Sequence, residues 1–204
     1  AGKTTIANLL TRLWDIQEDS IAIDGRDIRE YKLAELRRAV QPIQQDVQLF
    51  GTTIRENITL GLELSQEEIE NACRAVQAWD FISRLPEGIN TELKEGAVNL
   101  SVGERQLIAF ARAIAQDPRI LILDEATSSV DTETEQKIQT ALRRITEGRT
   151  SLVIAHRLST IRNADRILVL SHGELVEEGS HEELLASDGL YATLYRLQYQ
   201  GRVA

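Results

Sequence analysis

Residues 119–131 read RILILDEATSSVD, and this stretch decides the fold that the sequence predicts. Its apolar run ILIL predicts a strand buried on both faces, as in a parallel sheet that is covered by helices. Similar runs follow at 152–155 (LVIA) and 167–170 (ILVL), and the patterns of 102–116 and 132–146 are helical. Strands that alternate with helices predict an α/β fold with right-handed crossovers, whose ligands bind at the carboxyl ends of the strands.

The flanking segments predict further helices and strands. Residues 3–14 carry apolar residues at the spacing of one helix face, and SIAIDG at 20–25 predicts a strand that enters a turn. A polar, helix-rich region extends from 53 to 84. HGELVEEG at 172–179 predicts a hairpin next to the third apolar run, and helices follow to the end.

Composition narrows the classes of function. The net charge of −9 and the lack of a Lys/Arg-rich run argue against nucleic acid as a partner, because binding to phosphates needs basic side chains. The single cysteine, Cys73, allows no internal disulfide, and its helix-forming neighbours predict a packing residue in a reducing compartment. No run approaches the roughly 20 apolar residues of a membrane-spanning helix.

Two adjacent carboxylates, Asp124 and Glu125, end the first apolar strand. Side chains alternate along a strand, so the two point in different directions, and one could hold a metal ion while the other faces a substrate. In a nucleotide hydrolase, Asp124 would hold Mg²⁺ and Glu125 would act as the general base. The structural alternative is that the pair merely ends a strand and caps a helix, and an isolated pair favours that alternative.

The segment LSVGERQ at 100–106 predicts the start of a helix. Ser101 followed three residues later by Glu104 is the pattern of a capping box. The same helix terminus offers free N–H groups and a hydroxyl to an anion, and Gly103 would let a phosphate approach the backbone closely. The structural and the functional interpretation are therefore compatible.

Three further features gain meaning only in combination. GKTT at 2–5 matches the second half of the phosphate-loop pattern G-x-x-x-x-G-K-[ST], in which the lysine reaches the β- and γ-phosphates. His156 follows an apolar strand at the predicted ligand-binding edge, although a lone histidine more often packs or is solvated. Gln45 has little meaning by itself.

In chain order, GKTT, the Gln45 segment, LSVGERQ, ILILDE, SSVD and His156 form one combination. On these motifs the chain resembles, over essentially its whole length, the ATP-binding cassette (nucleotide-binding domain) of ABC transporters. LSVGERQ, which is similar to the family signature, is the most specific of them.

The resemblance implies a P-loop NTPase fold, an α/β core whose parallel sheet is flanked by helices, plus an α-helical signature subdomain. Residues 1–50 and 117–204 would form the RecA-like catalytic lobe, and residues 51–116 the helical lobe. The chain begins inside the Walker A loop. We therefore expect a fragment that lacks most of the family's N-terminal antiparallel β-subdomain and binds ATP poorly by itself.

The resemblance also implies ATP and Mg²⁺ as ligands, with roles carried over position by position. The residues that would contact ATP, in their own cassette or in the partner's site, are Gly2, Lys3, Thr4, Thr5, Ser101, Gly103 and Asp131. Those that would hold Mg²⁺ are Thr4, Gln45 and Asp124. The catalytic set would be Glu125, the switch histidine His156 and the Q-loop glutamine Gln45.

The partners implied are a second cassette, identical or different, and a transmembrane domain. In the family two cassettes meet head to tail, and each supplies its signature to the other's ATP. The segments 49–58, 154–170 and 189–200 are similar to the exporter branch of multidrug and lipid transporters. This places the chain at the cytoplasmic face of a membrane, that of a bacterial plasma membrane, where it would power export.

Two alternatives stay open from the residues. One is a soluble ABC ATPase that works in DNA repair or in translation. The repair type needs a long coiled coil between Gln45 and Ser101, but only about 55 residues without sustained heptads separate them. A regulatory cassette would bind ATP in a degenerate half-site. The intact Glu125, Ser101, Gly103 and His156 favour a competent site, whereas the partner's signature is not visible in this sequence.

Overall fold

The computed structural model describes residues 2–44, 47–124, 132–154 and 161–200. Its strands are β1 (Ala22–Ile23), β2 (Arg26–Asp27), β3 (Val40–Ile43), β4 (Ile120–Asp124), β5 (Thr150–Ile154), β6 (Ile167–Ser171) and β7 (Glu174–Gly179). Its α-helices are α1 (Lys3–Leu10), α2 (Leu33–Ala39), α3 (Ile54–Thr59), α4 (Gln66–Ala75), α5 (Trp79–Ile82), α6 (Val102–Gln116), α7 (Thr132–Thr146), α9 (His181–Ala186) and α10 (Leu190–Gln200). Short 3-10 turns are η1 (Ile28–Glu30), η2 (Gly88–Asn90) and η3 (Glu95–Ala97).

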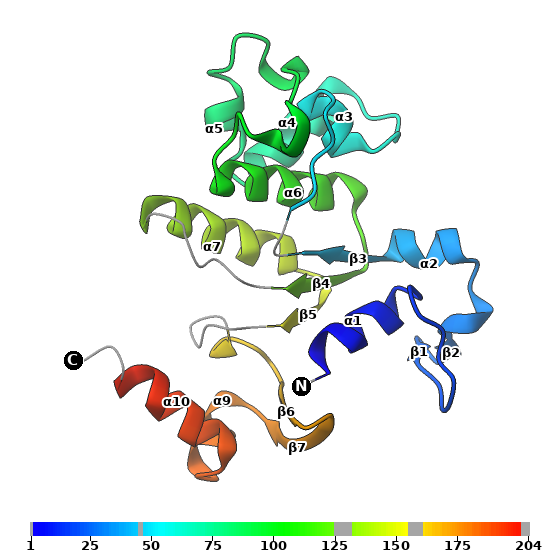
Figure 1. Ribbon diagram of the computed structural model, residues 1–204, viewed down its shortest axis with the longest axis vertical. Helices are drawn as coiled ribbons and strands as arrows, with labels where there is room; N and C mark the ends of the chain where they lie inside the picture. The colour runs from blue at the N-terminus through cyan, green and yellow to red at the C-terminus, as the bar shows by residue number, and fades with distance from the viewer. Residues whose placement is uncertain (1, 45–46, 125–131, 155–160, 201–204) are drawn as a thin grey trace.

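The centre of the fold is a parallel sheet of three strands in the order β3-β4-β5. Val40 pairs with Ile120, and Ile120 pairs with Thr150, so the three strands start level with one another. The connections run through helices, and the carboxyl ends of all three strands reach the same edge (Figure 1). The predicted α/β fold with a helix-flanked parallel sheet is confirmed.

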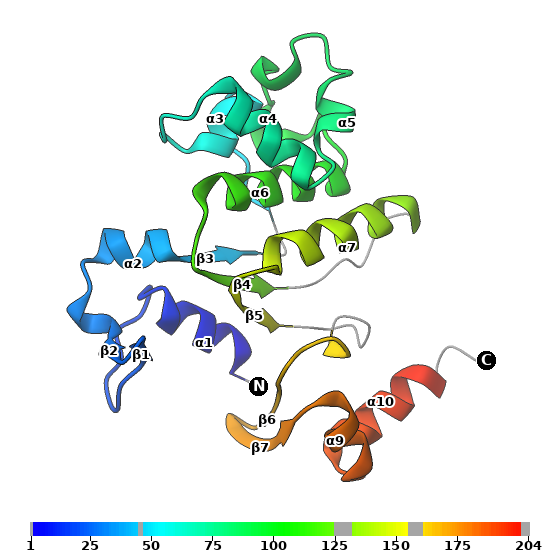
Figure 2. The ribbon, with the colours of Figure 1, turned by 180° about the vertical axis from the view of Figure 1, so that it is seen from behind.

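Both faces of this sheet are covered. Leu121 and Leu123 of β4 belong to a core that includes Ile108 of α6 and Ile138 of α7. Ile122, which lies between them, belongs to a second core with residues of α1 and α2. Figures 1 and 2 show α1 on one face of the sheet and α6 with α7 on the other. The continuous apolar run ILIL therefore reflects burial on two faces, as predicted.

Helices α3, α4 and α5 form a further layer over α6 (Figure 2). Capping boxes start α3 at Thr53, α4 at Ser65 and α6 at Ser101. Cys73 of α4 is fully buried in this layer, and burial raises the pKa of its thiol to about 12. The predicted packing role of the cysteine is confirmed, because its side chain belongs to the buried core.

The first helix is shorter than the 3–14 pattern predicts. Thr11 is the C-cap of α1, and Arg12 has a positive φ of 47° that ends the helix. The Arg37 guanidinium of α2 donates hydrogen bonds to the carbonyls of Thr11 and Arg12, at 3.2 and 3.1 Å. A tertiary contact thus satisfies the carbonyl of the C-cap residue and that of the residue after it.

The prediction that the third apolar run is a strand buried in the parallel sheet is wrong. Strand β6 pairs antiparallel with β7, and Leu168 is 49% exposed. His172 and Gly173 both have positive φ, which is the geometry of a type I′ hairpin turn. The turn folds the chain back on itself, so β6 finds its partner locally.

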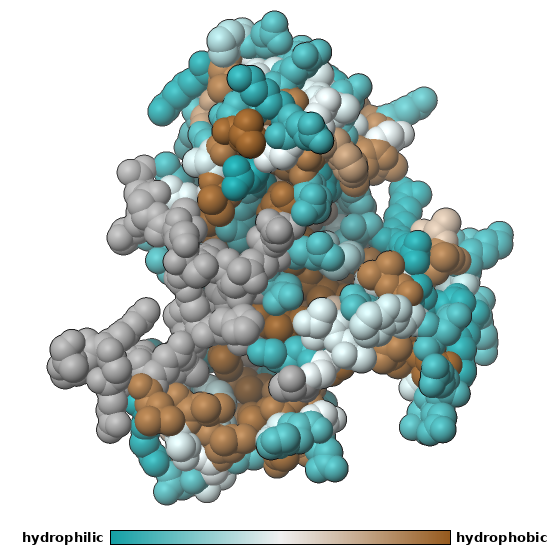
Figure 3. Space-filling model, in the orientation of Figure 1, coloured by the Kyte–Doolittle hydropathy of each residue, from teal (hydrophilic) through white to brown (hydrophobic). Residues whose placement is uncertain are grey.

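The last helix leaves apolar side chains at the surface. Leu190, Leu194 and Leu197 of α10 recur at helical spacing and are exposed. Figure 3 shows hydrophobic residues gathered over this helix. In the described part of the chain, no helix combines the length and the apolar character needed to cross a membrane.

Replacement of Ile108 by alanine should lower the free energy of unfolding by about 3 kcal/mol, because it leaves a cavity in a fully buried core. Leu197→Ala is the matched control, since this side chain is 61% exposed; its effect should stay within about 0.5 kcal/mol. Urea unfolding followed by circular dichroism measures both. Equal effects of the two variants would contradict the assignment of the core.

Candidate functional site

The carboxyl edge of the sheet is where the sequence predicts chemistry. The carboxyl ends of β3, β4 and β5 and the N-terminal end of α1 point to the same side of the molecule (Figures 1 and 2). Asp124 is the last residue of β4 and pairs with Ile154 of β5. The polar loops that follow parallel strands meet at such an edge, so Asp124 lies where a ligand is expected.

Four of the predicted site residues lie outside the described residues: Gln45, Glu125, Asp131 and His156. Their roles stay predictions. Along the chain, Gln45 follows β3, Glu125 comes directly after β4 and His156 follows β5, while Asp131 directly precedes α7.

The N-terminus of α1 has the features of an anion site. Gly2 is its N-cap with φ 87° and ψ −4°, a left-handed conformation that glycine adopts without steric strain. No side chain caps the helix, and its first turn contains no acidic residue. The N–H groups of the first turn are therefore available, and the helix dipole favours a negative charge there. Thr4 and Thr5 are exposed in this turn.

Lys3 lies at the border of a cavity of about 210 Å³ between β5 and β6. Its neighbours in the lining are mostly apolar, among them Ile6 of α1, Ile154 of β5 and Ile167 of β6. An amphipathic lysine suits such a place because the aliphatic stem tolerates apolar surroundings while the ammonium stays accessible.

The described donors fit a magnesium ion that is shared with phosphate. The Thr4 hydroxyl and the Asp124 carboxylate are oxygen ligands, which Mg²⁺ prefers. Within the described segments, no group of three or more His, Cys, Asp or Glu side chains could hold a metal ion. Mg²⁺ is commonly bound by one or two carboxylates together with the phosphates of a substrate, and Asp124 and Thr4 offer oxygen donors of that kind.

Ser101 begins α6 with the predicted capping box. Its hydroxyl oxygen accepts a hydrogen bond from the Glu104 amide at 3.2 Å, and the Ser101 amide donates to Glu104 Oε2 at 2.8 Å. The side chain is exposed, and its hydroxyl proton is not used by the cap, so it can be donated to an anion. Gly103, two residues further on, is buried.

Arg105 also belongs to this site, although no sequence pattern predicts a role for it. Its guanidinium donates to the carbonyl of Leu100 at 2.9 Å and also reaches the carbonyl of Ala97. These bonds fix the turn that precedes Ser101.

The structure separates the predicted binding residues into two groups. Gly2–Thr5 form the N-terminal end of α1, and Asp124, two residues after Ile122 on β4, shares the face of the strand that packs against α1 and α2. Ser101 and Gly103 start α6, which covers the opposite face (Figures 1 and 2). An anion at the N-terminus of α1 and an anion at the N-terminus of α6 would therefore occupy different places on one chain.

Comparison with known proteins links this arrangement to a family. The model of the ABC transporter family matches residues 1–128. The chain is 54% identical over 200 residues to "Uncharacterized ABC transporter ATP-binding protein YknV" of Bacillus subtilis (strain 168), covering 98% of this chain and 33% of that protein. It is 53% identical over 201 residues to the "ATP-dependent lipid A-core flippase" of Sodalis glossinidius (strain morsitans), covering 98% and 34%.

A solved structure is similar as well. A bacterial Atm1-family ABC exporter with ATP bound matches with a TM-score of 0.88 and 46% sequence identity. The match covers 97% of this chain and 35% of that one. The chain thus spans about one third of the length of the relatives it matches.

Replacement of Ser101 by alanine should lower the free energy of unfolding by about 1 kcal/mol through loss of the cap. Ser65→Ala is the matched control, because Ser65 starts α4 with the same capping box. Thermal unfolding of both variants checks this expectation. A cap at α6 that contributes nothing, beside a normal loss at α4, would contradict the geometry of Ser101.

Proposed function

The chain belongs to the ABC transporter family, and we propose that it is the ATP-hydrolysing cassette of an exporter. One observation carries the proposal: nearly the whole chain has the fold of one part of an exporter whose structure has ATP bound, with the N-terminus of α1 and Asp124 at the carboxyl edge of the sheet. The predicted family resemblance is confirmed by the family match and by the identity to its members.

The residues at the sheet edge would bind the nucleotide. The N–H groups of the first turn of α1, from Gly2 to Thr5, would hold the phosphates, with the Lys3 ammonium on the β- and γ-phosphates. Thr4, Asp124 and Gln45 would hold Mg²⁺, which neutralises phosphate charge when it is bound. The oxygen donors of Thr4 and Asp124 support this assignment.

Hydrolysis would depend on the residues that follow the strands. Glu125, directly after Asp124, would take a proton from the attacking water, and Gln45 would orient that water. His156, after β5, would contact the γ-phosphate. The support for these roles is the order of the motifs along the chain and their position after parallel strands.

Two cassettes would form the complete site. We propose that Ser101 and Gly103 of one cassette contact the ATP of the other, with Asp131 at the same interface. The separation of α1 and α6 on opposite faces of the sheet supports this arrangement. We propose the same two lobes as the sequence predicts: residues 1–50 with 117–204 form the catalytic lobe, and residues 51–116 form the helical lobe.

The other proposed partner is a transmembrane domain, at the cytoplasmic face of a bacterial plasma membrane. The relatives are about three times longer than this chain, and their names describe exporters and flippases. The names describe different kinds of exporter, and this chain is about equally identical in sequence to them. The sequence of the cassette therefore does not identify the transported substrate.

The alternatives have less support. The described helices between β3 and β4 are short and packed in one layer over α6, unlike the long coiled coil of a repair ATPase. A regulatory cassette with a degenerate half-site would lack a general base after β4, whereas Glu125 is present.

In the full polypeptide that carries this sequence, Glu125→Gln should keep ATP binding and lower kcat by about 100-fold or more, because it removes the general base. Single-turnover ATP hydrolysis and nucleotide-binding titration measure the two properties. Hydrolysis at the parental rate would remove Glu125 from its proposed role.

Ser101→Ala should lower the ATPase rate about tenfold or more, because it removes a hydrogen bond to a charged group. Ser65→Ala loses the same kind of cap in a helix remote from the predicted site, so its ATPase rate should stay near that of the parent. A similar loss of activity in both variants would show that only helix stability is involved.

A further inference from the structure

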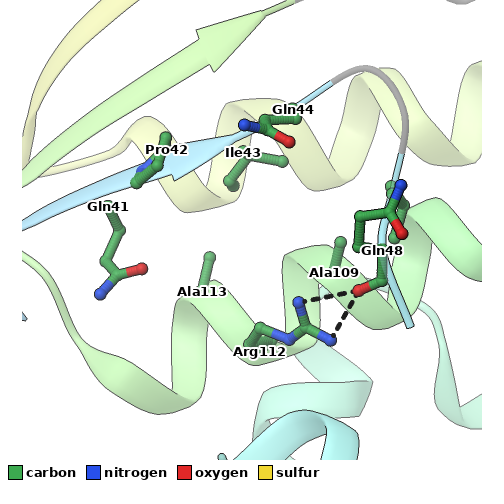
Figure 4. A pocket seen from close by; sticks show the side chains of 9 residues that line it. Gln41, Pro42, Ile43, Gln44, Gln48, Ala109, Arg112 and Ala113 are labelled. Atoms are coloured by element: carbon green, nitrogen blue, oxygen red, sulfur yellow. Dashed lines mark hydrogen bonds between the residues drawn. The ribbon is translucent and has the colours of Figure 1, made fainter. Parts of the chain in front are cut away.

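Arg112 of α6 forms a hydrogen-bonded clamp at the junction between the helical layer and the sheet (Figure 4). Its Nη1 and Nη2 atoms both donate to the carbonyl of Gln48 at 3.3 Å. Its Nε donates to the carbonyl of Asn57 at 2.7 Å, and Nη2 also reaches Asn57 Oδ1 at 3.3 Å. One guanidinium thus joins α6, α3 and the segment that leaves β3.

The acceptors of this clamp are carbonyl oxygens. Arg112 is half-buried, and desolvation lowers the pKa of its guanidinium, although an arginine stays charged at any physiological pH. A partly desolvated charge needs hydrogen-bond partners, and here these partners are amide dipoles. The hydrogen bonds that stabilise the Arg112 guanidinium therefore require Gln48 and Asn57 to stay in their observed positions.

Asn57 makes the other half of the clamp rigid. Its side chain is fully buried and accepts from the Phe50 amide at 2.8 Å. Its amide group donates to the carbonyls of Phe50 and Thr53 and to the Thr52 hydroxyl, at 3.0 to 3.2 Å. The backbone of 50–53 therefore moves with α3, and Gln48 is linked to this unit through Arg112.

Apolar packing alone does not fix this junction. A cavity of about 100 Å³ lies between β3 with its following residues and α6, lined by Gln44, Gln48, Ala109 and Arg112 among others (Figure 4). Leu49 is buried in the core, but hydrophobic contact is non-directional and tolerates sliding. Directional hydrogen bonds to Gln48 define the register of the segment against α6.

We infer that Arg112 is a positioning residue that couples the sheet edge to the N-terminus of α6. The inference rests on the proposed function. Ser101 and Arg112 lie on one continuous helix, about 16 Å apart along its axis at 1.5 Å per residue. A displacement of the backbone at Gln48 therefore moves α6 through the clamp, and α6 carries Ser101 and Gly103 with it.

The test uses the full polypeptide that carries this sequence, spin-labelled at Arg38→Cys on α2 and Glu67→Cys on α4. Cys73 is buried with a pKa of about 12, so the label spares it. Pulsed electron resonance gives the distance between the labels without nucleotide and with ATP, Mg²⁺ and orthovanadate. In the parent, we expect ATP to change this distance.

Arg112→Met keeps the length of the stem and removes the clamp. We expect ATP affinity within about twofold of the parent, a kcat about tenfold lower and loss of the ATP-dependent change in distance. Arg112→Lys should behave like Arg112→Met, because a single ammonium cannot span the acceptors that the planar fork reaches. This second variant keeps the test decisive where Arg112→Met fails to fold.

Arg149→Met is the matched control. Arg149 also binds two backbone carbonyls, those of Pro118 and Ile145 at 3.2 and 3.1 Å, and it pairs with Asp117 at the C-terminal end of α6, but it makes no contact with Gln48 or Asn57 in the hydrogen bonds of the described residues. It should lower the unfolding temperature and keep the change in distance and kcat. A clamp variant that behaves like this control, or full rescue by lysine, would overturn the inference. A parent that does not hydrolyse ATP would overturn the proposed function as well.

Discussion

The packing of β4 between two hydrophobic cores is the constraint on which the other parts of the structure depend. As the middle strand it pairs along both edges, and its side chains alternate between the cores. Leu121 and Leu123 hold α6 and α7, and Ile122 holds α1 and α2. A polar side chain at these positions would be buried without partners. The strand therefore offers a polar group only at its last residue, Asp124, where the cover of helices ends.

Helix α6 packs against β4 on one side and against the helical layer on the other, so it connects the two. Its apolar residues, such as Ile108, pack it against the sheet, while polar side chains along the helix bind the backbone of neighbouring segments. Ser101 caps the start, and Arg112 holds the segment that leaves β3. One rigid helix thus connects a candidate anion site with the edge that bears Asp124. A structural change at one of these two places could therefore be transmitted to the other through α6.

Local signals predict much of this structure. The capping box of Ser101 and Glu104 and the apolar spacing behind it predict helix 102–116 with both ends as observed. Two predictions are wrong, and tertiary contacts are involved in both. Arg37 binds the backbone where α1 ends earlier than predicted, and β6 pairs with β7 and not with the parallel sheet. Sequence motifs predict the binding residues, whereas no motif predicts the role of Arg112. An arginine that binds main-chain carbonyls leaves no pattern, because every residue carries such an acceptor.

The two cores also limit how ligands could be shared between the helix termini. Moving Ser101 to the N-terminus of α1 within one chain would require α6 to leave the face that it covers. That would expose the core around Leu121 and Leu123 to water. Loss of a large buried side chain from a core costs several kcal/mol, which is comparable with the roughly 5–15 kcal/mol that stabilises a whole domain. A second chain avoids this cost, since it presents its own α6 without unfolding either core. The burial of β4 on both faces is thus a physical argument for the proposed arrangement, in which two cassettes complete one site together.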